Sequence, residues 1–356
     1  MTAHDVARRR FRRQAFREDL DAFYVSALPN IRYLTGFTGS AGHLLVEPDR
    51  TTLFVDGRYE TQASDQASGI DVSVSKSDPL QALLNDVRKR KLYRIGVERN
   101  RLSLESYERL RAVRKKIRPL DGIVEELRAI KSVDEIDRIR RSEALNSEVF
   151  EAVVGRIRGT WTEERLACEL EYEMRRRGAE GAAFPSIVAS GSHGARPHAM
   201  PRPVKLKRNA LVVVDHGAIL DGYASDMTRM IALGVPSSEQ LSMVDAVREA
   251  QDAAIKTVRS GVACSTVDRA ARSALTKRGL DRYFVHSTGH GLGLEIHELP
   301  RIGSQVRTRL KTGMTITIEP GVYIEGLGGV RIEDVVVVGA DGCESLTPTS
   351  RELRIL

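Results

Sequence analysis

Two aspartates in otherwise apolar strands constrain this chain more than any other feature of its sequence. The segment LVVVDHGAILDGYASDMTRMIAL (211–233) predicts a β-hairpin about an Asp221-Gly222 turn, with Asp215 and Asp226 in its strands. Aspartate is disfavoured in strands and costly in apolar surroundings. A two-residue turn sets Gly217 opposite Asp226, and Asp215 shares their face because side chains alternate along a strand. The two carboxylates then repel unless positive charge lies between them; a surface hairpin with spare acids is the alternative.

A second segment repeats the pattern. MTITIEPGVYIEGLGGVRIEDVVVV (314–338) predicts strands that carry Glu319 and Glu333 on either side of a glycine-rich turn. Their separation is even, so an odd-length loop or a bulge would bring them to one face. With His290 from STGHGLGLEIHELP (287–300), the four carboxylates match the charge of two divalent cations. The spacing of these residues does not by itself establish a metal site. Taken alone, His290 or His297 fits a core or surface position as well as it fits a functional one.

The length of 356 residues favours two domains. Strand and helix patterns alternate over residues 1–125, which predicts an α/β domain, and the segment 22–37 reads as β-rich with a break at Pro29. From residue 126 onward the pattern changes to long helices and long strands. Ser132, with Glu135 three residues later, is the predicted N-cap of the first of these helices. We therefore expect a second domain over residues 126–356.

Composition narrows the function classes. The net charge is +7 and includes the basic run RRRFRRQAFR (8–17), which is typical of a solvated helix face. A nucleic-acid surface would need aromatic residues or a known module beside the charge, so we expect no nucleic-acid partner. No apolar run of about 18 residues and no secretory signal is evident, so we expect no membrane span. Three scattered cysteines fit a cytoplasmic location.

Several longer motifs resemble those of the pita-bread metallopeptidases (M24), in the branch that contains aminopeptidase P and prolidase. In the second domain the matching segments are FPSIVASGSHGARPHAMP, DHGAILDGYASDMTR, HSTGHGLGLEIHELP, TIEPGVYI and GGVRIED. In the first domain, PNIRYLTGFTGSAGHLLV and LFVDGRY resemble the creatinase-type N-terminal domain of the same enzymes. The resemblance implies a creatinase-like α/β domain followed by a pita-bread domain. One departure is His216, where family members usually carry an apolar or aromatic residue.

The resemblance also implies a metal centre. Asp215 would bind one divalent ion and His290 and Glu319 the other, while Asp226 and Glu333 bridge both. Manganese or cobalt are the usual ions, with zinc as a third option.

For the chemistry, the resemblance implies hydrolysis of the bond before proline, with Glu319 moving the proton of the attacking water. The implied roles of the other side chains fall into two groups. Those that contact the substrate are His198, His297 and His286. Those that bind substrate or support the ligands are Arg301, Arg331, Arg229 and Tyr223.

Substrate length divides the candidate activities. We expect an Xaa-Pro aminopeptidase that acts on short peptides, with Xaa-Pro dipeptidase (prolidase) as the alternative. A pita-bread binding protein with an idle site is a remoter alternative. A strict dipeptidase needs an arginine for the C-terminal carboxylate, and Arg301 is the first candidate, with Arg196 and Arg202 as others. The expected partners are proline-containing peptides and a second copy of the chain in a homodimer.

Overall fold

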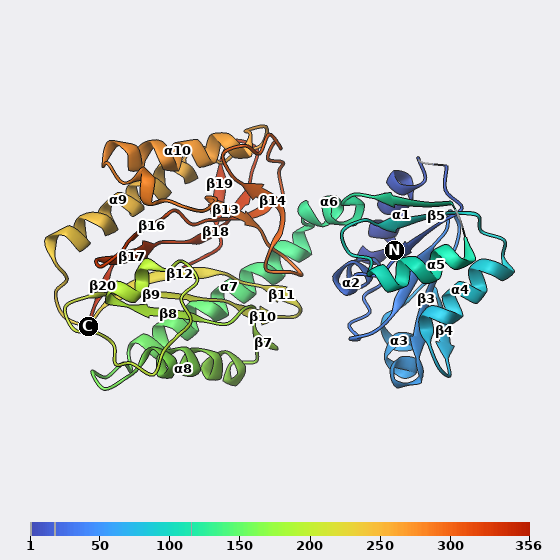
Figure 1. The fold of residues 1–356 in the computed structure, drawn as a ribbon, viewed down its shortest axis with the longest axis horizontal. Helices are drawn as coiled ribbons and strands as arrows, with labels where there is room; N and C mark the ends of the chain where they lie inside the picture. The colour runs from blue at the N-terminus through green and yellow to red at the C-terminus, as the bar shows by residue number, and fades with distance from the viewer. Residues whose placement is uncertain (1, 18, 115) are drawn as a thin grey trace. The chain divides into compact units, whose positions relative to one another are not determined.

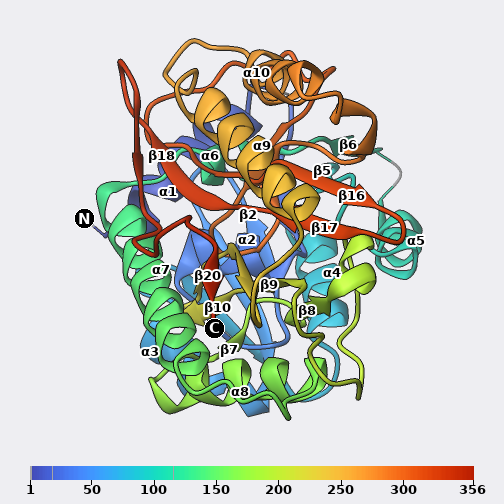
Figure 2. The ribbon, with the colours of Figure 1, turned by 90° about the vertical axis from the view of Figure 1, so that its left-hand side faces the viewer.

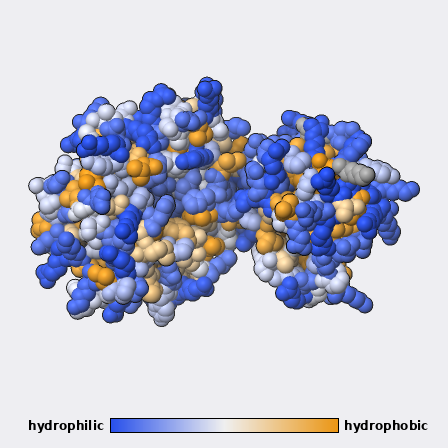
Figure 3. Space-filling view, viewed as in Figure 1, coloured by the Kyte–Doolittle hydropathy of each residue, from blue (hydrophilic) through white to orange (hydrophobic). Residues whose placement is uncertain are grey.

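The computed structural model describes residues 2–17, 19–114 and 116–356. These divide into two compact units, residues 1–128 and 129–356, whereas the boundary predicted from the sequence lies at residue 125. Among the described residues, no helix is long and apolar enough to cross a membrane. On the face drawn in Figure 3, hydrophilic residues predominate and apolar residues are scattered among them.

The first unit is built on one mixed sheet of six strands in the order β4-β3-β2-β1-β5-β6. The pairs β1–β2 and β2–β3 are antiparallel and the others are parallel. The strands are β1 (Ala22–Val25), β2 (His43–Val46), β3 (Thr51–Asp56), β4 (Asp71–Ser75), β5 (Arg94–Glu98) and β6 (Lys116–Leu120). The helices are α1 (Ala3–Ala15), α2 (Leu28–Thr35), α3 (Glu60–Gln66), α4 (Pro79–Lys89), α5 (Leu104–Val113) and α6 (Ile123–Ala129).

The prediction that residues 22–37 are β-rich is wrong for most of that segment, because only β1 is a strand and α2 follows it. Pro29 lies in the first turn of α2, where its missing N–H costs no helical hydrogen bond. The N-cap residue, Ala27, has no side chain that could cap the helix. Glu98 at the end of β5 instead fixes the chain just before the helix, since its carboxylate accepts from the backbone N–H groups of Ser26 and Ala27 at 2.7 and 2.9 Å.

The second unit is helical on two sides, with strands between (Figures 1 and 2). The pair α7 (Val133–Val154) and α8 (Glu163–Arg176) shares one apolar core with the strands, and the pair α9 (Ser238–Ile255) and α10 (Cys264–Lys277) shares the other. Ser132 caps α7 in a reciprocal capping box with Glu135, as predicted.

The strands of this unit form four small sheets. The N-terminal half of this unit supplies β7 (Gly181–Ala182), β8 (Ile187–Ser190), β9 (Leu211–His216), β10 (Ala218–Leu220), β11 (Tyr223–Ala224) and β12 (Met227–Ala232). The C-terminal half of this unit supplies β13 (Gly289–Gly291), β14 (Glu298–Ile302), β15 (Thr315–Ile318), β16 (Gly321–Ile324), β17 (Gly328–Arg331), β18 (Asp334–Val338), β19 (Cys343–Ser345) and β20 (Arg354–Ile355).

Strand β9 separates the two apolar cores. Val212 and Val214 pack with α7 and α8, whereas Leu211 and Val213 pack with α9 and α10. Because side chains alternate along a strand, Asp215 belongs to the second set and lies on the α9/α10 side of β9. The side chain of Asp215 therefore points toward the half of the unit that carries His290, Glu319 and Glu333.

Candidate metal centre

The first predicted hairpin has the register expected from its turn. Asp221 and Gly222 both have positive φ, 51° and 77°, as a two-residue turn of this kind requires. Leu220 pairs with Tyr223, and the same register continues to the pairing of β9 with β12. It therefore sets Gly217 opposite Asp226. Gly217 lies in the break between β9 and β10, and Asp226 lies in the break between β11 and β12. Asp215 and Asp226 share one face of this hairpin.

In the second hairpin, Glu319 and Glu333 lie directly opposite each other. Ile318 pairs with Asp334, and Gly321 pairs with Arg331, so the register on both sides matches 319 with 333. The loop between β16 and β17 has three residues (325–327), which is the odd length that a shared face requires. Both glutamates lie in gaps between consecutive strands, where they interrupt the ladder.

His290 in β13 joins the two hairpins. Its Nε2 lies 3.6 Å from Asp226 Oδ2 and 3.3 Å from Glu319 Oε1. Its Nδ1 lies 3.0 Å from the carbonyl oxygen of Gly291. A proton on Nδ1 satisfies that carbonyl and leaves Nε2 as the free lone pair, which is the tautomer a metal ligand needs. One ligand atom each from Asp226, His290 and Glu333 lies within 4.8 Å of the others.

The electrostatics of the cluster demand a positive charge. Burial raises the pKa of Asp226 well above its usual value, and the neighbouring Glu333 and Asp215 raise it further. Burial, with Glu319 next, likewise raises the pKa of Glu333, and burial raises that of Glu319. The Oδ1 atom of Asp215 is buried without any hydrogen-bond partner. Buried acids in this state fit divalent cations, which compensate the charge and take up the unpaired oxygen.

Neighbouring side chains hold the acids in place. Arg331 forms an ion pair with Asp215 and donates from Nε to Thr228 Oγ1 at 3.0 Å. Thr228 in turn donates to Glu333 at 2.7 Å, and Thr317 donates to Glu319 at 3.1 Å. The carboxylates therefore sit in a preformed frame of hydrogen bonds.

Sequence reasoning missed Thr228 and Thr317, and also Glu143 of α7. Glu143 is fully buried, and its carboxylate accepts from the backbone N–H of Asp226 at 2.8 Å. Burial raises its pKa to about 8. A signal for Glu143 exists in the sequence, because it falls on the apolar stripe of α7 between Ile139 and Phe150. For the two threonines, common in buried strands, no such signal exists.

Three of the predicted histidines gather beside the cluster. The ring of His297 lies 4.4 Å from that of His290, edge to face. His286 Nε2 lies 2.9 Å from the hydroxyl of Tyr323, which accepts from Arg331 at 2.6 Å. His198 follows Pro197, whose carbonyl oxygen accepts from Arg331 Nη1 at 3.2 Å. Burial lowers the pKa of His286 and of His297, and His198 contributes to both shifts.

The predicted arginines lie in different settings. Arg331 supports a ligand carboxylate, as described above. Arg229 is buried and binds the backbone carbonyl of Glu333 and the carboxylate of Asp334, so it fixes the main chain and no ligand side chain. Arg301 of β14 pairs with His290 across the antiparallel ladder, and directly opposite residues share a face. Arg202 is occupied by an ion pair with the buried carboxylate of Glu163.

Tyr223 is not part of the cluster. Its hydroxyl donates to Glu135 of α7 at 3.2 Å, and its ring packs with Ile139 and Leu292. The charged groups around it are Glu135, Arg138 and Glu298. The turn at Asp221 and Gly222 directs this side chain toward α7, away from the metal ligands, so the structure gives it no place in the site.

His216 lies on the opposite face of β9 from Asp215. It is fully buried and stacks on Phe150, with ring centroids 5.9 Å apart and an interplanar angle of 7°. Both ring nitrogens lack a hydrogen-bond partner. This departure from the family pattern therefore leaves the ligands untouched and places a polar ring in an apolar core.

Comparison with known proteins agrees with this geometry. Residues 137–340 match the model of metallopeptidase family M24. The chain belongs to metallopeptidase family M24. Residues 8–130 match the creatinase/prolidase N-terminal domain, so this M24 enzyme has a creatinase-type domain followed by a pita-bread domain, as predicted.

Relatives of this M24 enzyme include several peptidases that act next to proline. It is 35% identical to the Xaa-Pro dipeptidase of Pyrococcus furiosus over 94% of this chain and 95% of that protein. Its fold matches an Xaa-Pro dipeptidase from Bacillus anthracis with a TM-score of 0.96 and 35% identity, over 99% and 100% of the two chains. An X-Pro aminopeptidase from Thermotoga maritima matches with a TM-score of 0.90 and 35% identity, over 97% and 100%.

Proposed function

We propose that this M24 enzyme is a metal-dependent Xaa-Pro dipeptidase. Several relatives named Xaa-Pro dipeptidase match along nearly the whole chain, which supports this alternative to the aminopeptidase activity predicted first. The observation that carries the proposal is the position of Arg301. It pairs with His290 on the face that carries the metal ligands, and its side chain is exposed.

Arg301 suits the recognition of a free C-terminus. Within the described part of the chain, it has no hydrogen bond and no ion pair that would occupy its guanidinium. An arginine offers two parallel N–H groups that match the two oxygens of a carboxylate. A dipeptide presents its carboxylate one residue beyond the scissile bond, whereas a longer peptide presents an amide there. Arg301 therefore favours dipeptides over longer substrates.

Five side chains would hold two divalent cations, with manganese or cobalt favoured and zinc as a third option. They are Asp215, Asp226, His290, Glu319 and Glu333. Divalent ions bound by such a set polarise a carbonyl oxygen and lower the pKa of water.

Glu319 is suited to move a proton. Its carboxylate lies 3.3 Å from His290 Nε2, among the side chains that would hold the cations, so it is within reach of a water bound there. We infer that Glu319 receives the proton of the attacking water and passes it to the leaving prolyl nitrogen. His297 and His198 would bind the substrate and the tetrahedral intermediate from the side of His290.

Proline explains why a dedicated enzyme is needed. The imide nitrogen carries no hydrogen and the ring fixes φ, so an ordinary peptidase loses a donor and meets a steric clash. The leaving nitrogen gains a hydrogen only when the bond breaks, which makes a proton carrier such as Glu319 necessary.

The test compares kcat/KM for an Xaa-Pro dipeptide and for the tetrapeptide Xaa-Pro-Yaa-Zaa at equal metal loading. We expect the dipeptide to be preferred by more than about tenfold, or about 1.4 kcal/mol in transition-state binding. Arg301→Ala should remove that preference and leave tetrapeptide hydrolysis nearly unchanged. Arg307→Ala is the matched control, since Arg307 is an exposed arginine in the loop after β14.

A preference for the tetrapeptide would contradict the proposal and favour an Xaa-Pro aminopeptidase. The similarity to the enzyme of Thermotoga maritima supports that second candidate. The proposal also includes a homodimer in the cytoplasm, and light scattering on the purified chain tests the dimer.

A further inference from the structure

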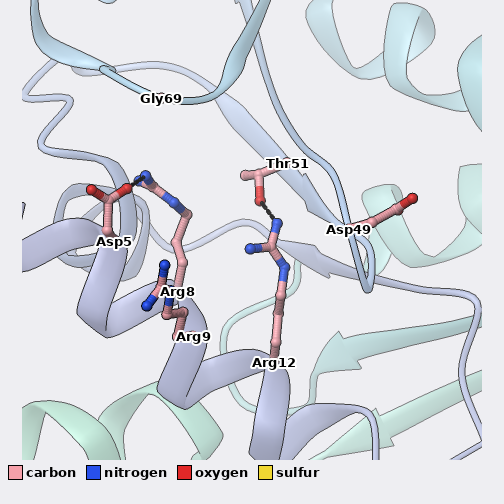
Figure 4. Close-up of a pocket in the computed structure, with 7 residues that line it drawn as sticks. All are labelled: Asp5, Arg8, Arg9, Arg12, Asp49, Thr51 and Gly69. Atoms are coloured by element: carbon pink, nitrogen blue, oxygen red, sulfur yellow. Dashed lines mark hydrogen bonds and ion pairs between the residues drawn. The ribbon is translucent and has the colours of Figure 1, made fainter. Parts of the chain in front are cut away.

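The arginine-rich helix α1 lines a pocket of about 360 Å³ within the first unit (Figure 4). The pocket is far in sequence from the metal ligands and is formed by this unit alone. Its lining residues are Asp5, Arg8, Arg9, Arg12, Asp49, Thr51 and Gly69. Three of the seven are arginines from consecutive turns of one helix, so α1 is more than a solvated face.

Arg8 anchors the pocket and is already neutralised. It is only 3% exposed, forms an ion pair with Asp5, and donates to the carbonyl oxygens of Leu34 and Ser68 at 2.8 and 3.3 Å. Its charge and most of its N–H groups are therefore used within the fold.

Arg12 is held in place without a matching negative charge. Its Nε donates to the carbonyl oxygen of Glu47 at 2.8 Å, and its Nη2 donates to Thr51 Oγ1 at 2.7 Å. Both acceptors are uncharged oxygens, and the carboxylate of Glu47 is paired with Arg90. Burial lowers the pKa of Arg12 and the nearby charge of Arg8 lowers it further, while the charges of Asp49 and Glu47 offset part of this shift. Its remaining nitrogen points toward the space beside Arg8 and Arg9 (Figure 4).

Arg9 adds a second uncompensated charge. It is exposed, and among the described residues it has no hydrogen-bond or ion-pair partner. The acidic groups balance Arg9 and Arg12 only in part, because Asp5 is paired with Arg8. The carboxylate of Asp49 points away from the guanidinium groups and forms no ion pair with Arg12, on which it acts only through space (Figure 4).

We propose that this pocket binds a small oxyanion of the phosphate class. The free N–H groups of Arg9 and Arg12 offer the planar donor geometry that phosphate oxygens accept. The hydroxyl of Thr51, which accepts from Arg12, keeps its own hydrogen to donate to the anion. A pocket of this size admits a phosphate group together with a small molecule that carries it.

Calorimetric titration of the metal-loaded, full-length chain with inorganic phosphate tests the proposal, at constant ionic strength. Arg9→Gln removes one donor without breaking any contact of the fold, so we expect binding to weaken by about tenfold or more, equivalent to about 1.4 kcal/mol. Arg10→Gln is the matched control, because it removes the same charge from the same helix outside the pocket. Binding of phosphate at the metal centre is common to both variants and cancels in the comparison.

Arg12→Lys provides a second variant that keeps the charge and loses the planar fork, and we expect it to weaken binding too. Glycerol phosphate as an alternative titrant distinguishes the sources of the anion. Tighter binding than that of inorganic phosphate identifies a phosphomonoester, and equal binding identifies the free anion. Equal phosphate affinity in Arg9→Gln and Arg10→Gln, or the absence of saturable binding, would overturn the proposal.

Discussion

Replacement of His216 by phenylalanine should stabilise the second unit, and increasingly so as the pH falls. His216 is fully buried against Phe150 with no partner for either ring nitrogen. Burial, together with the charge of Arg229, lowers its pKa from 6.5 to about 3. A buried polar group without a hydrogen bond costs about 1–3 kcal/mol, and this cost is independent of pH.

The pH-dependent part follows from the two pKa values. Between pH 6.5 and about 3, the unfolded chain protonates His216 while the folded chain does not. The stability contributed by the neutral imidazole is therefore complete above pH 6.5 and is lost as the pH falls. At about pH 4.5 the loss is about 2.7 kcal/mol, because each pH unit is worth about 1.36 kcal/mol. Phenylalanine has no such loss, so its advantage should grow by about 2.5 kcal/mol between about pH 7 and about pH 4.5.

Urea unfolding of metal-free protein, followed by the fluorescence of Trp161, measures this difference. Trp161 is the chain's single tryptophan and is buried in the same apolar core as Phe150, so it reports on the unit that holds His216. The larger ring of phenylalanine adds a packing cost, and His216→Leu is the control for it. The two variants should differ from each other by a constant and show the same dependence on pH. An advantage that does not change with pH would refute the reasoning.

Three further predictions concern the site. Chelation and metal add-back should show that His290→Ala loses metal, whereas His297→Ala keeps its metal and loses turnover. Loss of metal in His297→Ala but not in His290→Ala would mean that the roles assigned to the two histidines are reversed. Glu319→Gln should lower turnover by at least about 10²-fold while the chain stays folded by circular dichroism, and near-normal turnover would refute a proton-transfer role. Glu163→Gln should lower kcat/KM at unchanged metal content, because Glu163 binds His193 and Arg202 at the two ends of the loop that carries His198; an unchanged kcat/KM would exclude this positioning role.

The register of the first hairpin was predictable because the chemistry of its turn sets it. The Asp221-Gly222 turn requires positive φ at both residues, and that local requirement fixes which side chains lie opposite each other for the rest of the ladder. For Glu319 and Glu333 the sequence left the loop length open, since a glycine-rich turn is compatible with several lengths. The three-residue loop of the structure resolves that choice.

Other parts of the site depend on contacts between distant segments. The sequence does not indicate that Pro197 contributes a carbonyl oxygen to Arg331, because a main-chain acceptor leaves no trace in residue type. It also does not indicate that the pairing of β13 with β14 shifts in register between His290 and Gly291. The helix at 28–35 was missed because no side chain caps it, and because Glu98, which holds the chain before it, comes from a strand that is distant in sequence.

The central claim is that five side chains bind two divalent cations and that these cations are required to hydrolyse the bond before proline. The most direct measurement titrates metal-free enzyme with Mn²⁺ while recording both bound metal and hydrolysis of alanyl-proline. We predict two bound ions per chain, activity that rises with their occupancy, and loss of both in Asp226→Asn, since Asp226 is the proposed ligand of both ions. Hydrolysis at full rate by verified metal-free enzyme, or saturation of metal binding without any hydrolysis of alanyl-proline, would contradict the account.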